Sequence, residues 1–180
     1  MLGVTHGASG AAAGLAVGLL APSPWVGLGC GVVGYVSAYA PDLDHPSSTA
    51  TRTLWVAGWV LCAVLRAVSQ ALTGARHRGI SHSLVFAAGV GLVFGVVAGV
   101  WLPAGVAVLG GLSGFAGVVA ALVGDAVTRA GLDHVMWPFE WRLNVPKVLR
   151  VRTGSWVELA LILPVTVVAA GVLAVLVVSP

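Results

Sequence analysis

Long apolar stretches separated by short polar segments make up almost the whole chain. The apolar stretches predict five membrane-spanning helices, at residues 4–21, 25–40, 84–102, 104–123 and 156–178. The first two are short, because a helix needs roughly 20 residues to cross a hydrocarbon core of ~30 Å. The sequence Pro22-Ser23-Pro24 separates them and predicts a helical hairpin.

Glycines recur at every fourth position within these stretches. The first contains Gly10, Gly14 and Gly18, and the second contains Gly27 and Gly31. Glycines at this spacing form a flat strip that lets two helices approach closely in lipid. We therefore expect a tight hairpin whose two ends, near residues 6 and 42, lie on the same side of the membrane. The stretches at 84–102 and 104–123 carry glycines at the same spacing.

The apolar stretch at residues 54–73 can be interpreted in two ways, because Arg66, Ser69 and Gln70 interrupt it. If it crosses the membrane, the basic residues divide between the two sides. If it lies along the interface, all nine Lys and Arg residues fall on one side, as the preference for cytoplasmic positive charge requires. We favour the second interpretation, which predicts five spans plus an interfacial helix, with a cytoplasmic N-terminus and a C-terminus outside.

Composition supports an all-α, polytopic membrane protein. Of the 180 residues, 58% are hydrophobic and 8% are charged, whereas soluble domains carry about 25% charged residues. We expect one integral-membrane domain over residues 1–180, with polar segments at 41–53, 74–83 and 124–155. No basic residue precedes the first apolar stretch, so we expect that helix to be retained rather than cleaved as a signal peptide. Cys30 and Cys62 lie inside apolar stretches and are expected to be buried.

The polar residues that could bind a metal or take part in catalysis lie at the predicted helix ends. Charged groups near a membrane are costly unless they are paired or bind a metal, so such a cluster marks a candidate functional site. Carboxylate and imidazole donors together suit a borderline cation such as Zn²⁺ or Mn²⁺. The candidate metal ligands are His6, Asp42, Asp44, His45, His77, His82 and Asp125.

Each of these residues also has an ordinary explanation when taken alone. His6 could be an interfacial histidine, and an aspartate such as Asp42 is a common turn residue. His77 could belong to a basic loop that contacts lipid head groups, and Asp125 could pair with Arg129 on a helix surface. The joint placement of all these residues on one membrane face favours a common site.

Four motifs in order resemble those of the YdjM-type inner-membrane proteins. They are Thr5-His6, the segment Pro41–Pro46, the segment His77–Ser83, and Asp125-x-x-Thr-x-x-Gly followed by Trp137-Pro138-Phe139. The resemblance covers residues 5 to about 139. That family is described as membrane-bound metal-dependent hydrolases, and some members are linked to LexA and the SOS response. The resemblance therefore implies an inner-membrane location and a metal-dependent hydrolase activity.

This chain departs from the family pattern at one position, where Ala121 stands in place of a histidine four residues before Asp125. His134 could substitute for that ligand, or it could simply be an interfacial histidine.

A hydrolase of this kind would use a metal that lowers the pKa of water, with a carboxylate outside the metal shell as general base. We expect Asp44, His82 and Asp125 to be catalytic, and Arg76 and Arg78 to bind an anionic ester or phosphoester. Such a substrate could be a lipid at the cytoplasmic face. No Gly-x-Ser-x-Gly or His-Glu-x-x-His motif is present.

A non-enzymatic membrane protein for transport, membrane remodelling or partner binding, with a structural or degenerate His/Asp site, is the alternative. The basic segment Arg142–Arg152 favours contact with membrane lipids rather than specific nucleic-acid binding, because apolar residues are interspersed within it. The sequence does not indicate an oligomeric state.

Overall fold

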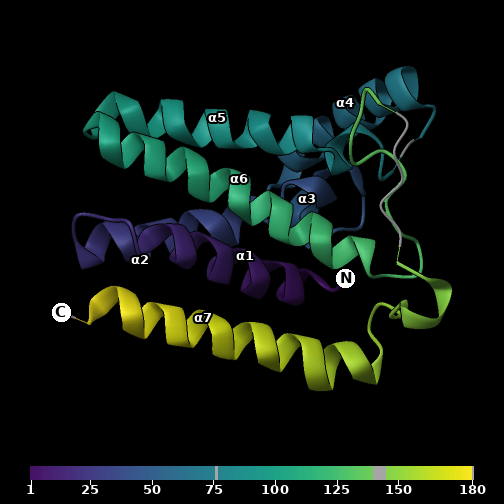
Figure 1. Ribbon diagram of the computed structural model, residues 1–180. Helices are drawn as coiled ribbons and strands as arrows, with labels where there is room; N and C mark the ends of the chain where they lie inside the picture. Colours follow the sequence, from purple (N-terminus) through teal and green to yellow (C-terminus); the bar gives the residue numbers. More distant parts are fainter. Residues whose placement is uncertain (76, 140–144, 180) are drawn as a thin grey trace.

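The structure is a computed structural model and describes residues 1–75, 77–139 and 145–179. Five helices lie side by side and alternate in direction (Figure 1). The chain termini therefore lie at opposite ends of the bundle. The five helices are α1 (Gly3–Gly18), α2 (Pro24–Ser37), α5 (Leu84–Trp101), α6 (Ala104–Ala126) and α7 (Leu163–Val178). A short π-helical segment, Glu158–Ile162, leads into α7.

Two further helices, α3 (Thr49–Thr53) and α4 (Trp55–Thr73), lie at the end of the bundle where the N-terminus is found (Figure 1). α4 packs on α3 and on two 3₁₀ turns, η1 (Pro41–Asp44) and η2 (Ile80–His82). This arrangement agrees with the prediction of a five-helix membrane bundle and a separate helix between its second and third members.

Among the described residues, length and composition alone qualify four helices to cross a membrane. They are α4, α5, α6 and the continuous helix Glu158–Val178. α1 and α2, with 16 and 14 residues, are about 24 and 21 Å long. Both are short for a span, but they lie in the bundle between α6 and α7 (Figure 1).

The helices of the bundle meet through small residues, as the glycine spacing predicts. Gly10 lies against the backbone of Gly34, and Gly14 lies against the Cys30 carbonyl and Gly34. Gly117 of α6 faces the same stretch of α2. A side chain at any of these positions would collide with backbone, so the glycines allow α1, α2 and α6 to pack closely.

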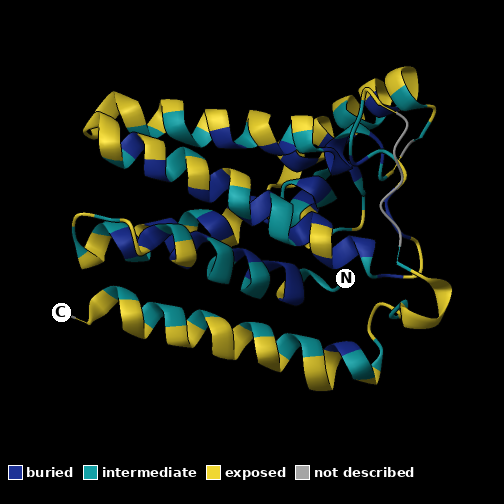
Figure 2. Ribbon diagram, in the orientation of Figure 1, coloured by how far each residue is buried: buried dark blue, intermediate teal, exposed yellow. Residues whose placement is uncertain are grey.

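The outer faces of the bundle are apolar and exposed, whereas polar side chains are buried at one end. α5 and α7 present mostly exposed residues, and α1 is largely enclosed (Figure 2). Cys30 and Cys62 are buried, as predicted. In the described part of the chain, β-structure is limited to an isolated bridge between Thr128 and Val151. The chain is an all-α membrane protein whose apolar surface suits lipid.

One boundary differs from the sequence prediction. α6 continues to Ala126, so Asp125 lies in its last turn rather than in the following polar segment. The small residues Gly124 and Ala126 on either side keep this turn compatible with close packing, and both are buried. The carboxylate of Asp125 is therefore held on a rigid helix.

Candidate metal centre

The turn that carries Asp42 and Asp44 is held in place by α3. Ser48 caps α3 by accepting a hydrogen bond from the Thr51 amide at 3.1 Å. The Thr51 hydroxyl donates to the carbonyl of His45 at 2.9 Å, and Thr51 is buried. The short helix thus fixes the backbone that follows Asp44.

The segment His77–Ser83 is held in a similar way by α4. The buried Ser69 of α4 accepts a hydrogen bond from the Ile80 amide at 3.0 Å. A side chain at Gly79 would collide with Ser69 and Thr73, so this glycine allows the segment to lie close to α4. Arg78 has a positive φ of 57°, which is uncommon for a residue with a side chain. This bend directs the Arg78 amide and its guanidinium to different carboxylates.

Asp125 is the first of two buried carboxylates at the centre of the cluster. Its Oδ1 lies 2.6 Å from the Met1 amino group and 3.1 Å from Nη2 of Arg78. Nε2 of His6 lies 3.4 Å from the same oxygen, and Nε2 of His82 lies 3.2 Å from Oδ2. The negative charge of Asp125 is therefore surrounded by cationic and hydrogen-bonding groups, as a buried charge requires.

Asp44 is the second buried carboxylate, and its side chain is fully enclosed. Oδ1 lies 2.7 Å from Nδ1 of His77, and Oδ2 accepts hydrogen bonds from the Arg78 amide at 3.1 Å and the Ser81 hydroxyl at 2.5 Å. Burial alone raises the pKa of Asp44, but the His77 hydrogen bond, the charge of His82 and the Ser81 hydrogen bond hold it below its ordinary value. Asp44 is therefore ionised at neutral pH.

The histidines connect the two carboxylates. His82 is fully buried, with Nδ1 3.7 Å from Oδ2 of Asp44 and Nε2 3.2 Å from Oδ2 of Asp125. The ring centroid of His77 lies 5.4 Å from that of His82 and 4.9 Å from that of His45. The three rings form a row from the buried network toward the surface, where the His77 side chain is 39% exposed.

Among the described residues, one group of three donors is close enough to share a metal ion. Donor atoms of His6, Asp42 and Asp125 all lie within 4.8 Å of one another. Ligand atoms at ~2.1 Å from a tetrahedral Zn²⁺ are about 3.4 Å apart, so the observed spacing requires a closure of up to about 1.4 Å. His6 also has a buried Nδ1 without a hydrogen-bond partner in the described chain. One imidazole and two carboxylates from α1, η1 and α6 therefore fit a divalent metal.

The other predicted ligands are nearby but outside that group. Asp44, His77 and His82 belong to the hydrogen-bonded network described above, and Nδ1 of His45 contacts the Ser47 hydroxyl at 3.0 Å. Ala121 is buried in α6. His134 is half-buried and is not part of the three-donor group.

A cavity of about 420 Å³ opens beside the donors. Asp42, His45, His77, Arg78 and Asp125 contribute to its lining. Its volume is within the ~300–1,000 Å³ of small-molecule sites. The chain therefore offers a polar cavity, of a size suited to a small molecule, beside the candidate metal ligands.

Arg78 is the one predicted substrate-binding residue that the structure describes, since Arg76 lies outside the described residues. Its Nη1 donates to the Thr128 hydroxyl at 3.1 Å and to the Gly131 carbonyl at 2.9 Å. Nη2 donates once, to Asp125. A guanidinium has five N–H donors, so two remain without an acceptor in the described chain. The Arg78 side chain, 18% exposed, can therefore bind an anion in the cavity while it contacts Asp125.

Several residues that shape the site escaped the sequence reasoning. Ser69, Thr51 and Ser81 act through backbone or carboxylate contacts that depend on the fold, although Ser81 lies within a recognised motif. Glu158 is buried and accepts hydrogen bonds from the Leu2 amide at 2.6 Å and the Gly154 amide at 2.9 Å. This contact ties the start of the last helix to the start of α1. The sequence indicated this role of Glu158 only by placing a single acidic residue at the edge of an apolar stretch.

Together, the helical bundle and its buried His/Asp cluster define a polytopic α-helical membrane protein with a candidate metal centre at one end. Comparison with protein families matches residues 1–179 to the YdjM inner membrane protein family, and the chain belongs to that family. The resemblance inferred from the motifs is thus confirmed. Searches of curated proteins and of solved structures found no match.

Proposed function

We propose that the chain is a membrane-bound, metal-dependent hydrolase that cleaves an ester or phosphoester. The observation that carries the proposal is the convergence of His6, Asp42 and Asp125 within 4.8 Å, beside a cavity that also contains Arg78. These donors come from three segments that are distant in sequence. A cluster of ionisable groups at the end of an apolar bundle requires a functional or structural reason, because its burial is costly.

The donor set favours Zn²⁺ or Mn²⁺, held by His6, Asp42 and Asp125. Mixed imidazole and carboxylate ligands suit both ions. When bound, such an ion lowers the pKa of water and polarises the ester or phosphoryl oxygen. With three protein ligands, positions remain open for water or substrate.

His77 is the best-placed general base. Asp44 can only accept hydrogen bonds, so the proton between the two residues lies on Nδ1 of His77 and Nε2 carries the lone pair. His77 lines the cavity, whereas Asp44 is buried behind it. Asp44 therefore orients the imidazole and stabilises its protonated form, as the third member of a catalytic triad does.

The reaction on a phosphoester follows from these roles. Arg78 binds a non-bridging oxygen of the phosphoryl group through its free N–H donors. His77 takes a proton from water as the water oxygen bonds to phosphorus. The bond between phosphorus and the leaving oxygen breaks on the opposite side, the leaving oxygen takes a proton from water, and protonated His77 releases its proton to solvent. The products are an alcohol and a phosphate.

The site is proposed to face the cytoplasm. α1, α2, α5, α6 and α7 contain no Lys or Arg. The described Lys and Arg residues all lie in the segments that join these helices at the N-terminal end of the bundle (Figure 1). Since basic residues are concentrated on the cytoplasmic side of membrane proteins, that end is assigned to the cytoplasm of an inner-membrane protein.

The test combines metal analysis with an activity assay on the purified full-length protein. Elemental analysis should find Zn or Mn after loading, and the loaded protein should hydrolyse p-nitrophenyl phosphate or a p-nitrophenyl ester. The His77→Gln variant should retain metal but lose activity by about 10²–10⁴-fold, the usual contribution of a general base. Asp133→Asn removes an exposed carboxylate outside the cavity lining and should change neither property. Absence of bound metal, or full activity in His77→Gln, would contradict the proposal.

A structural role for the cluster is the alternative. It is favoured by one observation, namely that Asp125 already has the Met1 amino group and Arg78 as cationic partners. In that case the protein would serve transport, membrane remodelling or partner binding. The loaded protein would then contain no stoichiometric metal, and its thermal stability would not respond to chelators.

A further inference from the structure

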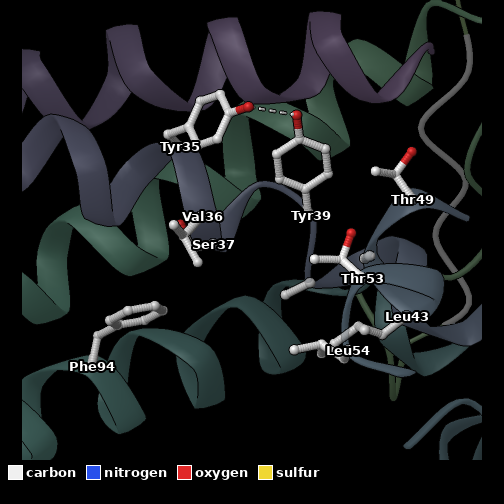
Figure 3. A pocket seen from close by; sticks show the side chains of 11 residues that line it. Tyr35, Val36, Ser37, Tyr39, Leu43, Thr49, Thr53, Leu54 and Phe94 are labelled. Atoms are coloured by element: carbon white, nitrogen blue, oxygen red, sulfur yellow. Dashed lines mark hydrogen bonds between the residues drawn. The ribbon is translucent and has the colours of Figure 1, made fainter. Parts of the chain in front are cut away.

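A second cavity, of about 440 Å³, adjoins the metal centre. Its lining comes from the end of α2, the following turn, α3 and the middle of α5 (Figure 3). Tyr39 and Thr49 line both this cavity and the polar one, so the two cavities share a wall. The Tyr39 hydroxyl donates to the Tyr35 hydroxyl at 3.1 Å, which fixes the ring at this boundary.

The two cavities differ in chemical character. The polar cavity contains Arg78, histidines and carboxylates. The second is lined mainly by apolar side chains, including Val36, Leu43, Leu54 and Phe94. Figure 3 places Tyr39, Thr49 and Thr53 together, with Phe94 at a distance from them. One end of the apolar cavity therefore lies beside the polar site, and the other is purely apolar.

The apolar cavity extends toward the membrane interior. Phe94 lies ten residues after the start of α5, which corresponds to about 15 Å along the helix. Val36 and Leu54 are 51% and 46% exposed, so the cavity opens to the outer surface of the bundle. A hydrocarbon chain in the surrounding bilayer can reach it from the side, without leaving the lipid.

The volume suits one hydrocarbon chain rather than two. A buried apolar cavity of about 150 Å³ holds one benzene molecule. The apolar cavity has therefore room for on the order of 15 to 20 carbon atoms. Charge complementarity fixes the other end of the ligand, because Arg78 offers two free donors to an anion.

We propose that the substrate is a single-chain lipid phosphoester. Its phosphate group lies in the polar cavity beside Arg78 and the metal ligands, and its acyl or alkyl chain lies in the cavity between Tyr39 and Phe94. This inference rests on the proposed hydrolase function and names the substrate class for the same site. Hydrolysis would split the bond between phosphorus and the lipid oxygen, so water and the phosphoester yield a lipid alcohol and phosphate.

Binding to the full chain in phosphatidylcholine nanodiscs tests the proposal. The probes are palmitoyl lysophosphatidic acid and glycerol 3-phosphate, which share a phosphoglycerol group and differ in the chain. Empty nanodiscs provide the partition background. The wild-type protein should bind the lipid at least about tenfold more tightly, because burial of only two methylene groups supplies that difference.

Two cavity variants separate chain binding from phosphate binding. Ala50→Phe fills the apolar cavity and should abolish the preference for the lipid without weakening binding of glycerol 3-phosphate. Phe94→Ala removes the distant wall and should reduce the preference, which keeps the test decisive if Ala50→Phe fails to fold. The matched control is Ala88→Phe, which fills a separate apolar groove of about 490 Å³ between α5 and α6 and should preserve the preference.

Metal content of the same preparations distinguishes the two proposals. Equal binding of both probes by a metal-loaded wild-type protein would overturn the lipid inference and leave the hydrolase proposal standing. An unchanged preference in both cavity variants would also overturn it. A chain preference in a protein that binds no metal would support the lipid site and refute the metal-dependent hydrolase.

Discussion

Asp42 and Asp44 are two residues apart in one motif, yet the structure predicts opposite consequences for their substitution. Asp42 is half-buried and lines the polar cavity, and its carboxylate makes no hydrogen bond or ion pair with the described residues, although its backbone bonds to Tyr39 and His45. Asp44 is fully buried and accepts three hydrogen bonds. Substitution by asparagine preserves size at both positions, removes the charge and replaces one acceptor oxygen with an NH₂ donor. We therefore expect Asp42→Asn to affect metal binding and Asp44→Asn to affect stability.

The loss of folding stability expected for Asp44→Asn follows from the hydrogen bonds that the Asp44 carboxylate accepts. The asparagine amide keeps one acceptor oxygen but presents its NH₂ group to donors that need an acceptor. Hydrogen bonds to a charged group contribute about 1.5–3 kcal/mol each, and breaking a buried pair costs about 3–5 kcal/mol. We expect a loss of about 3–5 kcal/mol. That corresponds to a decrease in Tm of roughly 6–20 °C for a chain of this size.

Asp42→Asn should change stability by less than about 0.5 kcal/mol, because no partner is left unpaired. Its metal affinity should decrease by more than about 100-fold, since even outer-shell changes cost 10- to 100-fold. Thermal unfolding of the metal-free protein in detergent gives the first quantity, and metal titration gives the second. Undiminished metal affinity in Asp42→Asn, or wild-type stability in Asp44→Asn, would refute the assignment of these two roles.

Three further outcomes are expected. Gly14→Ala should destabilise the protein by about 1–3 kcal/mol through overpacking between α1 and α2. The control Gly29→Ala, where a methyl group meets nothing within 4 Å, should be neutral or stabilising by up to about 1 kcal/mol. Equal shifts in Tm for the two variants would contradict the tight helix contact. Arg78→Lys keeps the charge but loses the fork that reaches Thr128, Gly131 and Asp125, so phosphate binding should weaken by about tenfold or more by titration. Single cysteines at Ser48 and Ala75 should both react with an impermeant thiol reagent from the cytoplasmic side in oriented vesicles; labelling from opposite sides would refute the proposed topology.

The helices could be predicted from the sequence with accuracy, because apolar length and proline position are strong signals in a membrane protein. Four of the predicted stretches correspond to bundle helices within about three residues, and the fifth does so when the π-helical segment before α7 is included; residues 54–73 correspond to the separate helix α4. The four-residue glycine spacing also predicted the close hairpin, since it depends only on helical periodicity. Gly34 and Gly117 contribute to the same contacts. Their role depends on which helix faces which, and this could not be predicted from spacing alone.

The candidate site was predicted as a set but not in its internal organisation. Asp42 and Asp44 lie in a 3₁₀ turn, in which successive residues are rotated by about 120°. Two residues two positions apart therefore point in different directions, one into the cavity and one into the protein. An irregular turn between two prolines gave no indication of this geometry. The same is true of Arg78, whose backbone and side chain contact different carboxylates because of a local positive φ.

The close packing of small residues and the proposed chemistry depend on each other. His6 lies on α1 and Asp125 on α6, and glycine contacts hold both helices against α2, so Nε2 of His6 lies 3.4 Å from Oδ1 of Asp125. The glycines far from the site thus set the distances within it. A bound metal would compete with Arg78 and the Met1 amino group for the carboxylate of Asp125. The metal affinity would therefore depend on the free energy needed to move these two cationic groups away from Asp125. Metal binding and bundle stability should consequently respond together to changes in helix spacing.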